Sequence, residues 1–329
     1  MQSATIIRAF NAYGITPESI APVQTGYRSQ VYIATDQTGK KHNLLLYKSE
    51  PSVLGKIRTA NRLSDYLSQQ GLPTRTTTDS RILSLRSGNN VQYACLYNYL
   101  PGNTISWEAY TMDHIKLVGK ALAIMHSKCL QLPQDDAPLA TTICLTTLSR
   151  METYFSDQGV AKAINNKLSV FINSKIINWL GQEVSSIPST HDQLLHMDFV
   201  RGNILFSPAA DKPDQLQEGK VRMSGIIDFE KVCFGNPAHD IARTLAFLLV
   251  DCKYKTIAQV RKYFLKSGYQ KRGSGTIENL EQIDKLVLFY LLHDFYKFLL
   301  HNPYESLQDN EHYIRTRDIL LSQKVLQKI

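Results

Sequence analysis

Short stretches in which apolar and polar residues alternate fill much of the first hundred positions, a pattern typical of half-buried β-strands. Five segments have this pattern and are rich in Val, Ile, Leu and Tyr: residues 20–25, 30–35, 42–48, 81–86 and 91–96. Residues 57–70 instead repeat apolar positions every three or four residues, which predicts a helix, and residues 5–13 predict a shorter one. This region should therefore be a small β-rich lobe with one main helix.

The pattern changes to a helical period beyond Leu100-Pro101-Gly102. Seven helices are expected: residues 112–128, 146–155, 160–184, 238–249, 256–267, 277–300 and 311–327. A strand-rich patch over residues 194–229, with a polar loop at 207–219, interrupts them. Strands followed by helices indicate an α+β fold rather than alternating βαβ units. We expect an N-terminal lobe over residues 1–97 and a larger, mostly helical C-terminal lobe over residues 98–329.

Charge and composition narrow the classes of protein. The formal net charge is +8, but the basic residues are dispersed, so a solvated surface is favoured over a nucleic-acid site. The apolar stretch 286–300 is interrupted by His293, Asp294 and Lys297 and is too short to span a bilayer, so no membrane insertion is expected. The five cysteines lack metal or redox spacing, which favours reduced thiols in the cytoplasm. Nothing in the pattern indicates an oligomeric state.

The segment HMDFVRGN, residues 196–203, contains the first candidate chemistry. Phosphoryl transfer needs a carboxylate that orients or deprotonates the acceptor hydroxyl, and oxygen ligands that hold Mg²⁺ against the phosphates. Asp198 and Asn203 are five residues apart, and a loop can return both side chains to one place. Asp198 would face the acceptor. The amide oxygen of Asn203 would face Mg²⁺, which prefers hard oxygen ligands.

A second segment, IIDFE at residues 226–230, places Asp228 at the end of an apolar strand. This position suits another metal ligand. Many strands end in Asp, so the segment alone is weak evidence. The two segments together, in this order and about thirty residues apart, indicate a phosphotransferase.

The N-terminal lobe should then bind the nucleotide, ATP or GTP. A turn that contains Gly26 and Ser29 lies between two predicted strands and could cover the phosphates. On the third predicted strand, Leu46 and Lys48 share a face by the two-residue period. If Leu46 lines an adenine slot, Lys48 points toward the phosphates.

These motifs resemble those of the aminoglycoside phosphotransferase and choline kinase group, which has the two-lobed protein-kinase-like fold. Besides HMDFVRGN and IIDFE, the chain has GNPAHDIA at residues 235–242, which is similar to the continuation of the family's metal segment. The resemblance covers about residues 20–250. It implies a cytoplasmic enzyme that phosphorylates an alcohol group of a small molecule, such as an aminoglycoside, an amino sugar or a choline-like alcohol.

The resemblance also implies a role for each matching residue. Asp198 would be the catalytic base, Asn203 and Asp228 would bind Mg²⁺, and Lys48 would bind phosphate. Asp240 would hold the catalytic loop by hydrogen bonds. The main-chain groups of Tyr97 to Tyr99 would meet the nucleotide base.

The chain departs from the family in two places. Met197 stands where the family usually has Gly. No acidic residue lies between Glu50 and Asp65, where the family's helix supplies a Glu partner for the lysine.

Three functions remain in view. A small-molecule kinase is favoured, because Pro237 follows only nine positions after Asp228 and a protein kinase needs a longer activation segment there. A catalytically impaired nucleotide-binding protein is the main alternative.

Other chemistries are disfavoured. The sequence lacks the Gly-x-Ser-x-Gly elbow of a Ser/His/Asp hydrolase, and the irregular spacing of His191, His196 and His239 favours structural roles over a metal cluster.

Overall fold

The chain divides into two compact units in a computed structural model that describes residues 2–23, 29–87, 90–170, 172–211, 214–271, 277 and 279–322. The first unit comprises Met1–Asn103 with two later segments, Leu205–Ser207 and Met223–Lys231. The second unit comprises Thr104–Ile204, Pro208–Arg222 and Val232–Ile329. This division assigns Asp228 to the first unit and Asp198 to the second. A functional boundary after Tyr97 stays a prediction.

The first unit is built on an antiparallel sheet of five strands in the order β1-β2-β3-β5-β4. The strands are β1 (Pro17–Pro22), β2 (Ser29–Asp36), β3 (Lys41–Tyr47), β4 (Leu83–Ser87) and β5 (Asn90–Asn98). Each of the five strands predicted from the sequence overlaps one of them. The β-rich part of the α+β prediction is therefore confirmed.

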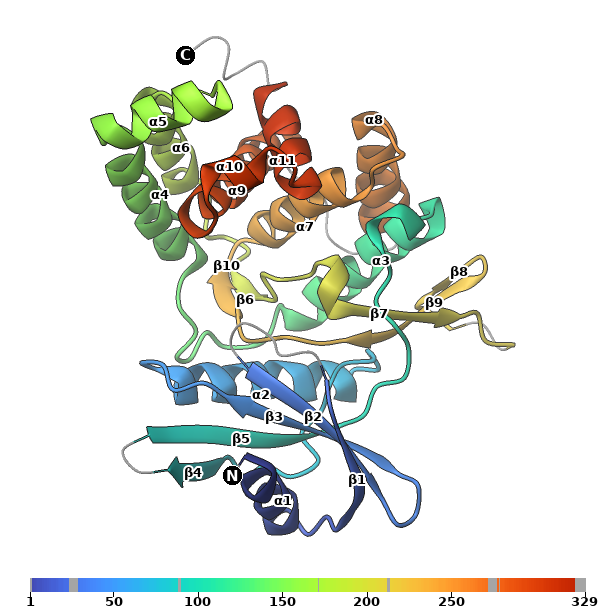
Figure 1. The fold of residues 1–329 in the computed structure, drawn as a ribbon. Helices are drawn as coiled ribbons and strands as arrows, with labels where there is room; N and C mark the ends of the chain where they lie inside the picture. The colour runs from blue at the N-terminus through green and yellow to red at the C-terminus, as the bar shows by residue number, and fades with distance from the viewer. Residues whose placement is uncertain are drawn as a thin grey trace. The chain divides into compact units, whose positions relative to one another are not determined.

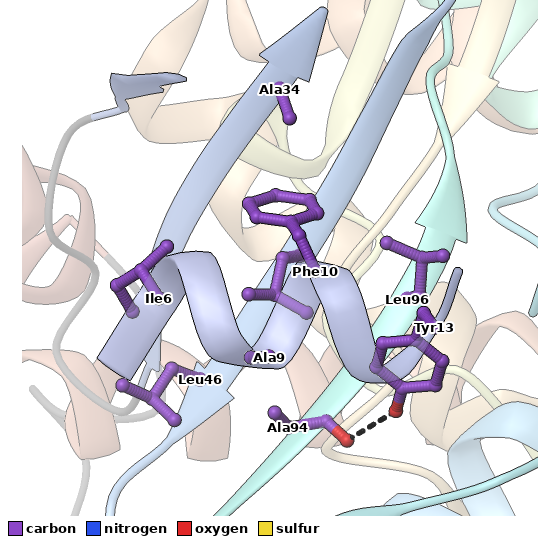
Figure 2. Close-up of a cluster of buried hydrophobic side chains, with 9 residues drawn as sticks. Ile6, Ala9, Phe10, Tyr13, Ala34, Leu46, Ala94 and Leu96 are labelled. Atoms are coloured by element: carbon purple, nitrogen blue, oxygen red, sulfur yellow. Dashed lines mark hydrogen bonds between the residues drawn. The ribbon is translucent and has the colours of Figure 1, made fainter. Parts of the chain in front are cut away.

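Two helices, α1 (Gln2–Ala12) and α2 (Val53–Gln69), cover opposite faces of this sheet (Figure 1). The two-residue period of β3 divides its side chains between them. Leu44 and Leu46 pack with Phe10 of α1, and Figure 2 shows Leu46 within this cluster. Leu45 and Tyr47 pack with Ile57 of α2.

The prediction that Leu46 lines an adenine slot is wrong. Its side chain is only 3% exposed and belongs to the core beneath α1. Leu46 points to this face because alternate residues of a strand face opposite sides of the sheet.

A smaller sheet of three strands has the order β7-β9-β8, with β7 (Ile204–Pro208), β8 (Gln217–Glu218) and β9 (Val221–Ile226). The first unit holds the end of β9 through Thr74, which forms a parallel bridge with Ile226. Gly102 lies close to β7 and has a φ of +116°. A Cβ there would lie 2.9 Å from the carbonyl oxygen of Phe206, so only glycine allows this approach.

The second unit is mostly helical, as predicted. Its main helices are α3 (Met112–Cys129), α4 (Ala140–Ser156), α5 (Gln158–Leu168), α6 (Ser174–Ser185), α7 (Ala238–Asp251) and α9 (Leu280–His301). The other helical segments include η1 (Trp107–Ala109), η2 (Arg201–Asn203), α8 (Ile257–Arg261), α10 (Tyr304–Leu307) and α11 (Glu311–Leu321). A two-stranded sheet joins β6 (Gln193–Leu195) to β10 (Cys233–Gly235). Among the described residues, no helix has the length and apolar character needed to cross a membrane.

The helix expected over 146–155 begins six residues earlier, as α4, and residues 323–327 of the last expected helix lie outside the described residues. Two other predicted helices are not the single α-helices expected. The single helix expected over residues 160–184 is two helices, because Ser169 adopts a left-handed backbone with a φ of 53° that ends α5, and Asn173 caps the start of α6. The helix expected over 256–267 begins as α8 and continues as a π-helix, η3 (Lys262–Gln270). Hydrophobic spacing does not distinguish these cases from a continuous α-helix.

Candidate active site

The loop of residues 196–203 is anchored at both ends in the second unit. It follows β6 and leads through η2 into β7. Leu194, Leu195 and Ile204 are fully buried. These apolar residues fix the points at which the polar segment leaves and re-enters the core.

Asp240, at the start of α7, holds the beginning of this loop. Its carboxylate accepts hydrogen bonds from the backbone N–H of His196 and of Met197, both at 2.8 Å, and lies 3.3 Å from Nε2 of His126. Asp240 is fully buried. Burial alone would raise the pKa of Asp240, but the His126 side chain and the donated backbone bonds lower it. Asp240 is therefore suited to remain charged, and its expected structural role is confirmed.

Met197 has a backbone conformation that is typical of glycine, the residue that the family usually has at this position. Its φ is +57°, in the left-handed region that glycine adopts without steric cost. The side chain is nevertheless 6% exposed and packs in the core. The bonds from Asp240 hold the strained backbone, and the buried thioether compensates part of the cost.

Asp198 is at the centre of a compact hydrogen-bond arrangement. Nδ2 of Asn203 donates to the backbone oxygen and to Oδ2 of Asp198, both at 3.0 Å. The Asp198 side chain is 8% exposed. The predicted return of Asn203 to Asp198 across five residues is thus observed, whereas the catalytic and metal roles of the two residues stay predictions.

Arg243 is a residue of this site that the sequence analysis missed. Its Nη2 donates to Oδ1 of Asp198 at 3.1 Å, and its guanidinium lies over the rings of Phe247 and Tyr290. Burial alone would lower the pKa of Arg243, but the neighbouring Asp198 carboxylate raises it. A signal was present in the sequence: Arg243 is the only Lys or Arg in an otherwise mostly apolar helix, three residues after Asp240 and hence on the same side of α7.

Asp228 lies in the first unit, two residues beyond β9. Its backbone also adopts the left-handed region, with a φ of +62°. Two residues later, Oε1 of Glu230 lies 2.7 Å from Nη1 of Arg75 and accepts a bond from the Tyr47 hydroxyl at 2.7 Å. Burial alone would raise the pKa of Glu230, but the Arg75 guanidinium lowers it to about 2. Neither Arg75 nor Glu230 was singled out from the sequence.

Tyr97 and Tyr99 have different surroundings. The Tyr97 ring is fully buried, and its hydroxyl donates to Oδ1 of Asn61 at 2.7 Å and lies 2.8 Å from the hydroxyl of Tyr47. The Tyr99 ring lies 5.0 Å from Nζ of Lys41. The expectation concerned their main-chain groups, and it stays a prediction.

The expected phosphate-binding residues are described in part. Gly26 lies outside the described residues. Ser29 is the first residue of β2 and pairs with Tyr47. Lys48 follows the end of β3 and is exposed, so the strand period does not set its direction. It borders a cavity of about 20 Å³ together with Lys56 and Glu230.

The helix that lacks the usual acid has other polar contacts. Ala60 is fully buried, and its neighbour Asn61 accepts the bond from Tyr97. The next acid along the helix, Asp65, accepts bonds from the backbone N–H of Thr77 at 2.8 Å and from its hydroxyl at 2.6 Å. Asp65 therefore fixes the segment after α2 and is not a partner for Lys48.

A cavity of about 620 Å³ in the second unit contains none of the predicted site residues. Its wall includes His126 and Tyr269, whose side chains lie 2.8 Å apart. His126 also contacts Asp240, so this cavity adjoins the support of the catalytic loop rather than Asp198 itself.

The residues present suit Mg²⁺ by their donor chemistry. Because Nδ2 of Asn203 donates to Asp198, the amide oxygen is the atom left to bind a cation. Asp228 carries a carboxylate, which is also a hard oxygen ligand of the type that Mg²⁺ prefers. Among the described residues, no group of three or more His, Cys, Asp or Glu side chains is placed to hold a metal by itself. This donor set is appropriate for an ion that arrives with a nucleotide.

Comparison with known proteins agrees with this chemistry. The sequence profile of the phosphotransferase enzyme family matches residues 19–254. A hydroxylysine kinase of Danio rerio is 22% identical over 251 residues, which cover 73% of this chain and 67% of that protein.

Solved structures give the fold. An amicoumacin kinase in complex with AMP-PNP and Ca²⁺ matches with a TM-score of 0.72 at 15% identity, covering 96% of this chain and 93% of that one. A microcompartment-associated aminopropanol kinase matches with a TM-score of 0.69 at 14% identity, covering 95% of each chain. The predicted protein-kinase-like fold is confirmed.

Proposed function

Because the chain belongs to the phosphotransferase enzyme family, we propose that it transfers the γ-phosphoryl group of ATP or GTP to a hydroxyl of a small molecule. The arrangement around Asp198 supports this proposal most strongly. A carboxylate held by Arg243 and Asn203, on a loop fixed by Asp240, is restrained in its orientation. Such a group can orient an acceptor hydroxyl and accept its proton during transfer.

The metal-binding roles are part of the same proposal. Asn203 and Asp228 would each offer an oxygen ligand for Mg²⁺. When bound, Mg²⁺ neutralises charge on the phosphates. Lys48 and the backbone near Ser29 would contact the phosphates, and the main chain of residues 97–99 would meet the base. Arg243 and Asp240 act on Asp198 and its loop, and they are positioning residues.

We infer that the acceptor carries an amine as well as a hydroxyl. The names of two relatives, a hydroxylysine kinase and an aminopropanol kinase, both describe amino alcohols.

A small acceptor is favoured over a protein. The segment that connects Asp228 to α7 is short and already contains β10. A protein kinase uses the corresponding region for an activation segment and a platform that binds the peptide. The five cysteines are buried and unpaired, which supports a reducing, cytoplasmic location.

Nucleotide consumption in the presence of amino alcohols tests this function. Each acceptor is paired with the same amine without its hydroxyl, for example hydroxylysine with lysine and aminopropanol with propylamine. The proposal predicts Mg²⁺-dependent formation of a phosphomonoester only with the hydroxyl compounds, and the ratio of ATP to GTP turnover identifies the donor. Equal nucleotide consumption with both members of every pair would contradict phosphoryl transfer to the alcohol.

A catalytically impaired nucleotide-binding protein is the second candidate, because α2 lacks the acid that usually pairs with the lysine. In that case the chain would bind nucleotide but form no phosphorylated product with any acceptor. Direct nucleotide binding, measured in parallel with the acceptor panel, separates the two candidates.

A further inference from the structure

The first unit contains a continuous chain of buried polar side chains that the proposed roles do not use. It runs from Asn61 of α2 to the Tyr97 hydroxyl at 2.7 Å, and from there to the Tyr47 hydroxyl at 2.8 Å. Tyr47 donates to Oε1 of Glu230, which also binds Arg75. We name this set of five residues the Arg75–Asn61 network. It links α2, β5 and β3 to the segment that contains Asp228.

The network contacts the Asp228 segment through side chains and through the backbone. The side chain of Glu230 interacts with that of Asp228. The backbone N–H of Arg75 donates to the carbonyl oxygen of Ile226 at 3.1 Å, and the N–H of Ile226 donates to Pro73 at 2.8 Å. The residues on either side of Asp228 are therefore held by the same short segment, residues 73–75.

The backbone of Asp228 needs such support. A non-glycine residue with a φ of +62° is strained by about 1–2 kcal/mol. Strain of this size persists only where the surroundings determine the conformation. The Arg75 guanidinium supplies a rigid anchor, because its side chain is 3% exposed and lies over the Tyr97 ring at 4.6 Å and the Phe229 ring at 5.9 Å.

We propose that Arg75, Glu230, Tyr47 and Tyr97 are positioning residues that fix the Asp228 carboxylate for a divalent cation. This proposal rests on the proposed function, in which Asp228 is a metal ligand. It also accounts for the missing acid on α2. The helix is joined to the metal segment through Asn61 and two tyrosines, instead of being joined to a lysine through a glutamate.

Binding of Mn²⁺ to the full chain in complex with ADP tests this positioning role without acceptor turnover. The loss of the EPR signal of free Mn²⁺ reports the binding. Partners beyond the direct ligands of a metal typically contribute 10–100-fold to its affinity. Glu230→Gln and Tyr47→Phe should therefore weaken Mn²⁺ binding about tenfold or more. The affinity for ADP in EDTA should remain within about twofold of that of the unmodified chain.

Tyr13→Phe is the matched control. The Tyr13 hydroxyl donates to the carbonyl oxygens of Arg81 and Ala94, on the opposite face of the same sheet (Figure 2). Loss of the Tyr13 hydroxyl should lower the melting temperature about as much as Tyr47→Phe does, and it should leave Mn²⁺ binding unchanged. If Tyr13→Phe weakens Mn²⁺ binding as much as Tyr47→Phe does, the network is merely structural and the proposal is wrong.

Two further outcomes separate this proposal from the proposed function. If the unmodified chain binds Mn²⁺ with ADP and Glu230→Gln weakens that binding, yet no acceptor is phosphorylated, the function fails and the positioning role stands. If the ADP complex of the unmodified chain binds no Mn²⁺, the assignment of Asp228 and the positioning role both fail.

Discussion

A buried arginine–carboxylate pair in the first unit and another in the second have different relations to the proposed site. In the first unit Arg75 binds Glu230 at 2.7 Å, two residues away from the proposed metal ligand. In the second unit Arg243 binds Asp198 at 3.1 Å, and Asp198 is the proposed catalytic group itself. The first pair fixes a segment of backbone, whereas the second acts directly on the charge and orientation of a reacting side chain.

This difference has consequences for how each pair responds to change. A group that only positions a segment can be replaced by another that preserves the geometry. A group that stabilises the charge of a catalytic carboxylate has no neutral substitute. The predictions below probe this contrast from the largest expected effect to the smallest.

Arg243→Met should be the most damaging of these changes. It leaves the Asp198 carboxylate buried without its cation, and breaking a buried ion pair from one side costs about 3–5 kcal/mol. The double variant Arg243→Met/Asp198→Asn removes both charges and should recover much of that loss. Urea unfolding of both variants and of Asp198→Asn measures the coupling. Strictly additive losses would show that the pair is not a unit.

Acid should destabilise the second unit through His239. This residue is fully buried, and its burial lowers its pKa to about 4 from the usual value near 6.5. Below pH 6.5 the folded state therefore binds fewer protons than the unfolded chain. The contribution of neutral His239 to the free energy of unfolding is complete above pH 6.5 and is lost as the pH falls toward 4. The slope reaches about 1.4 kcal/mol per pH unit, which amounts to about 3 kcal/mol in all.

The free energy of unfolding between pH 7 and pH 4.5, compared with that of His239→Gln, measures this contribution. The variant should show a shallower loss of stability with acid, whatever its stability at pH 7. Parallel curves for the two proteins would mean that His239 is not the titrating group.

Lys48→Ala should affect nucleotide binding rather than stability, since Lys48 is exposed beyond the end of β3. A hydrogen bond to a charged group contributes about 1.5–3 kcal/mol, so KM for the nucleotide should rise roughly ten- to hundredfold. Lys56→Ala is the comparison, because Lys56 borders the same small cavity and lies 3.7 Å from Glu50. A larger effect from Lys56→Ala would transfer the phosphate-binding role to Lys56.

Met197→Gly should have the smallest net effect in free energy of these changes. The change relieves about 1–2 kcal/mol of left-handed strain and removes a buried side chain worth about 2–3 kcal/mol. We expect a loss of about 1 kcal/mol, measured by urea unfolding, with turnover retained because the family has glycine here. A loss above about 4 kcal/mol would mean that the Met197 backbone is not the source of strain.

The sequence was sufficient for the architecture and for the loop that contains Asp198, because both are encoded locally. Alternating residues predicted the five strands, and the spacing of Asp198 and Asn203 predicted their contact. The contacts that sequence reasoning missed join distant positions. Arg75 and Glu230 are 155 positions apart in the sequence, and no local pattern indicates that pairing.

The sequence did not predict helix boundaries or the faces of strand residues where single residues or packing override the hydrophobic period. Ser169 ends a helix whose apolar spacing continues beyond it. Leu46 has the period expected of a strand, but the face that it occupies is determined by α1, which the strand pattern alone does not place. The positive φ of Met197 appears in the sequence only as a departure from the family's glycine.

Asp198→Asn tests the central claim most directly. Asn has nearly the same shape and can still bond with Asn203, but it cannot accept a proton from the acceptor hydroxyl. A general base contributes about 10²–10⁴-fold to a reaction, so kcat for acceptor phosphorylation should fall by at least a hundredfold while the Kd for the nucleotide stays within about threefold. Turnover of the variant at the rate of the unmodified chain would contradict the account.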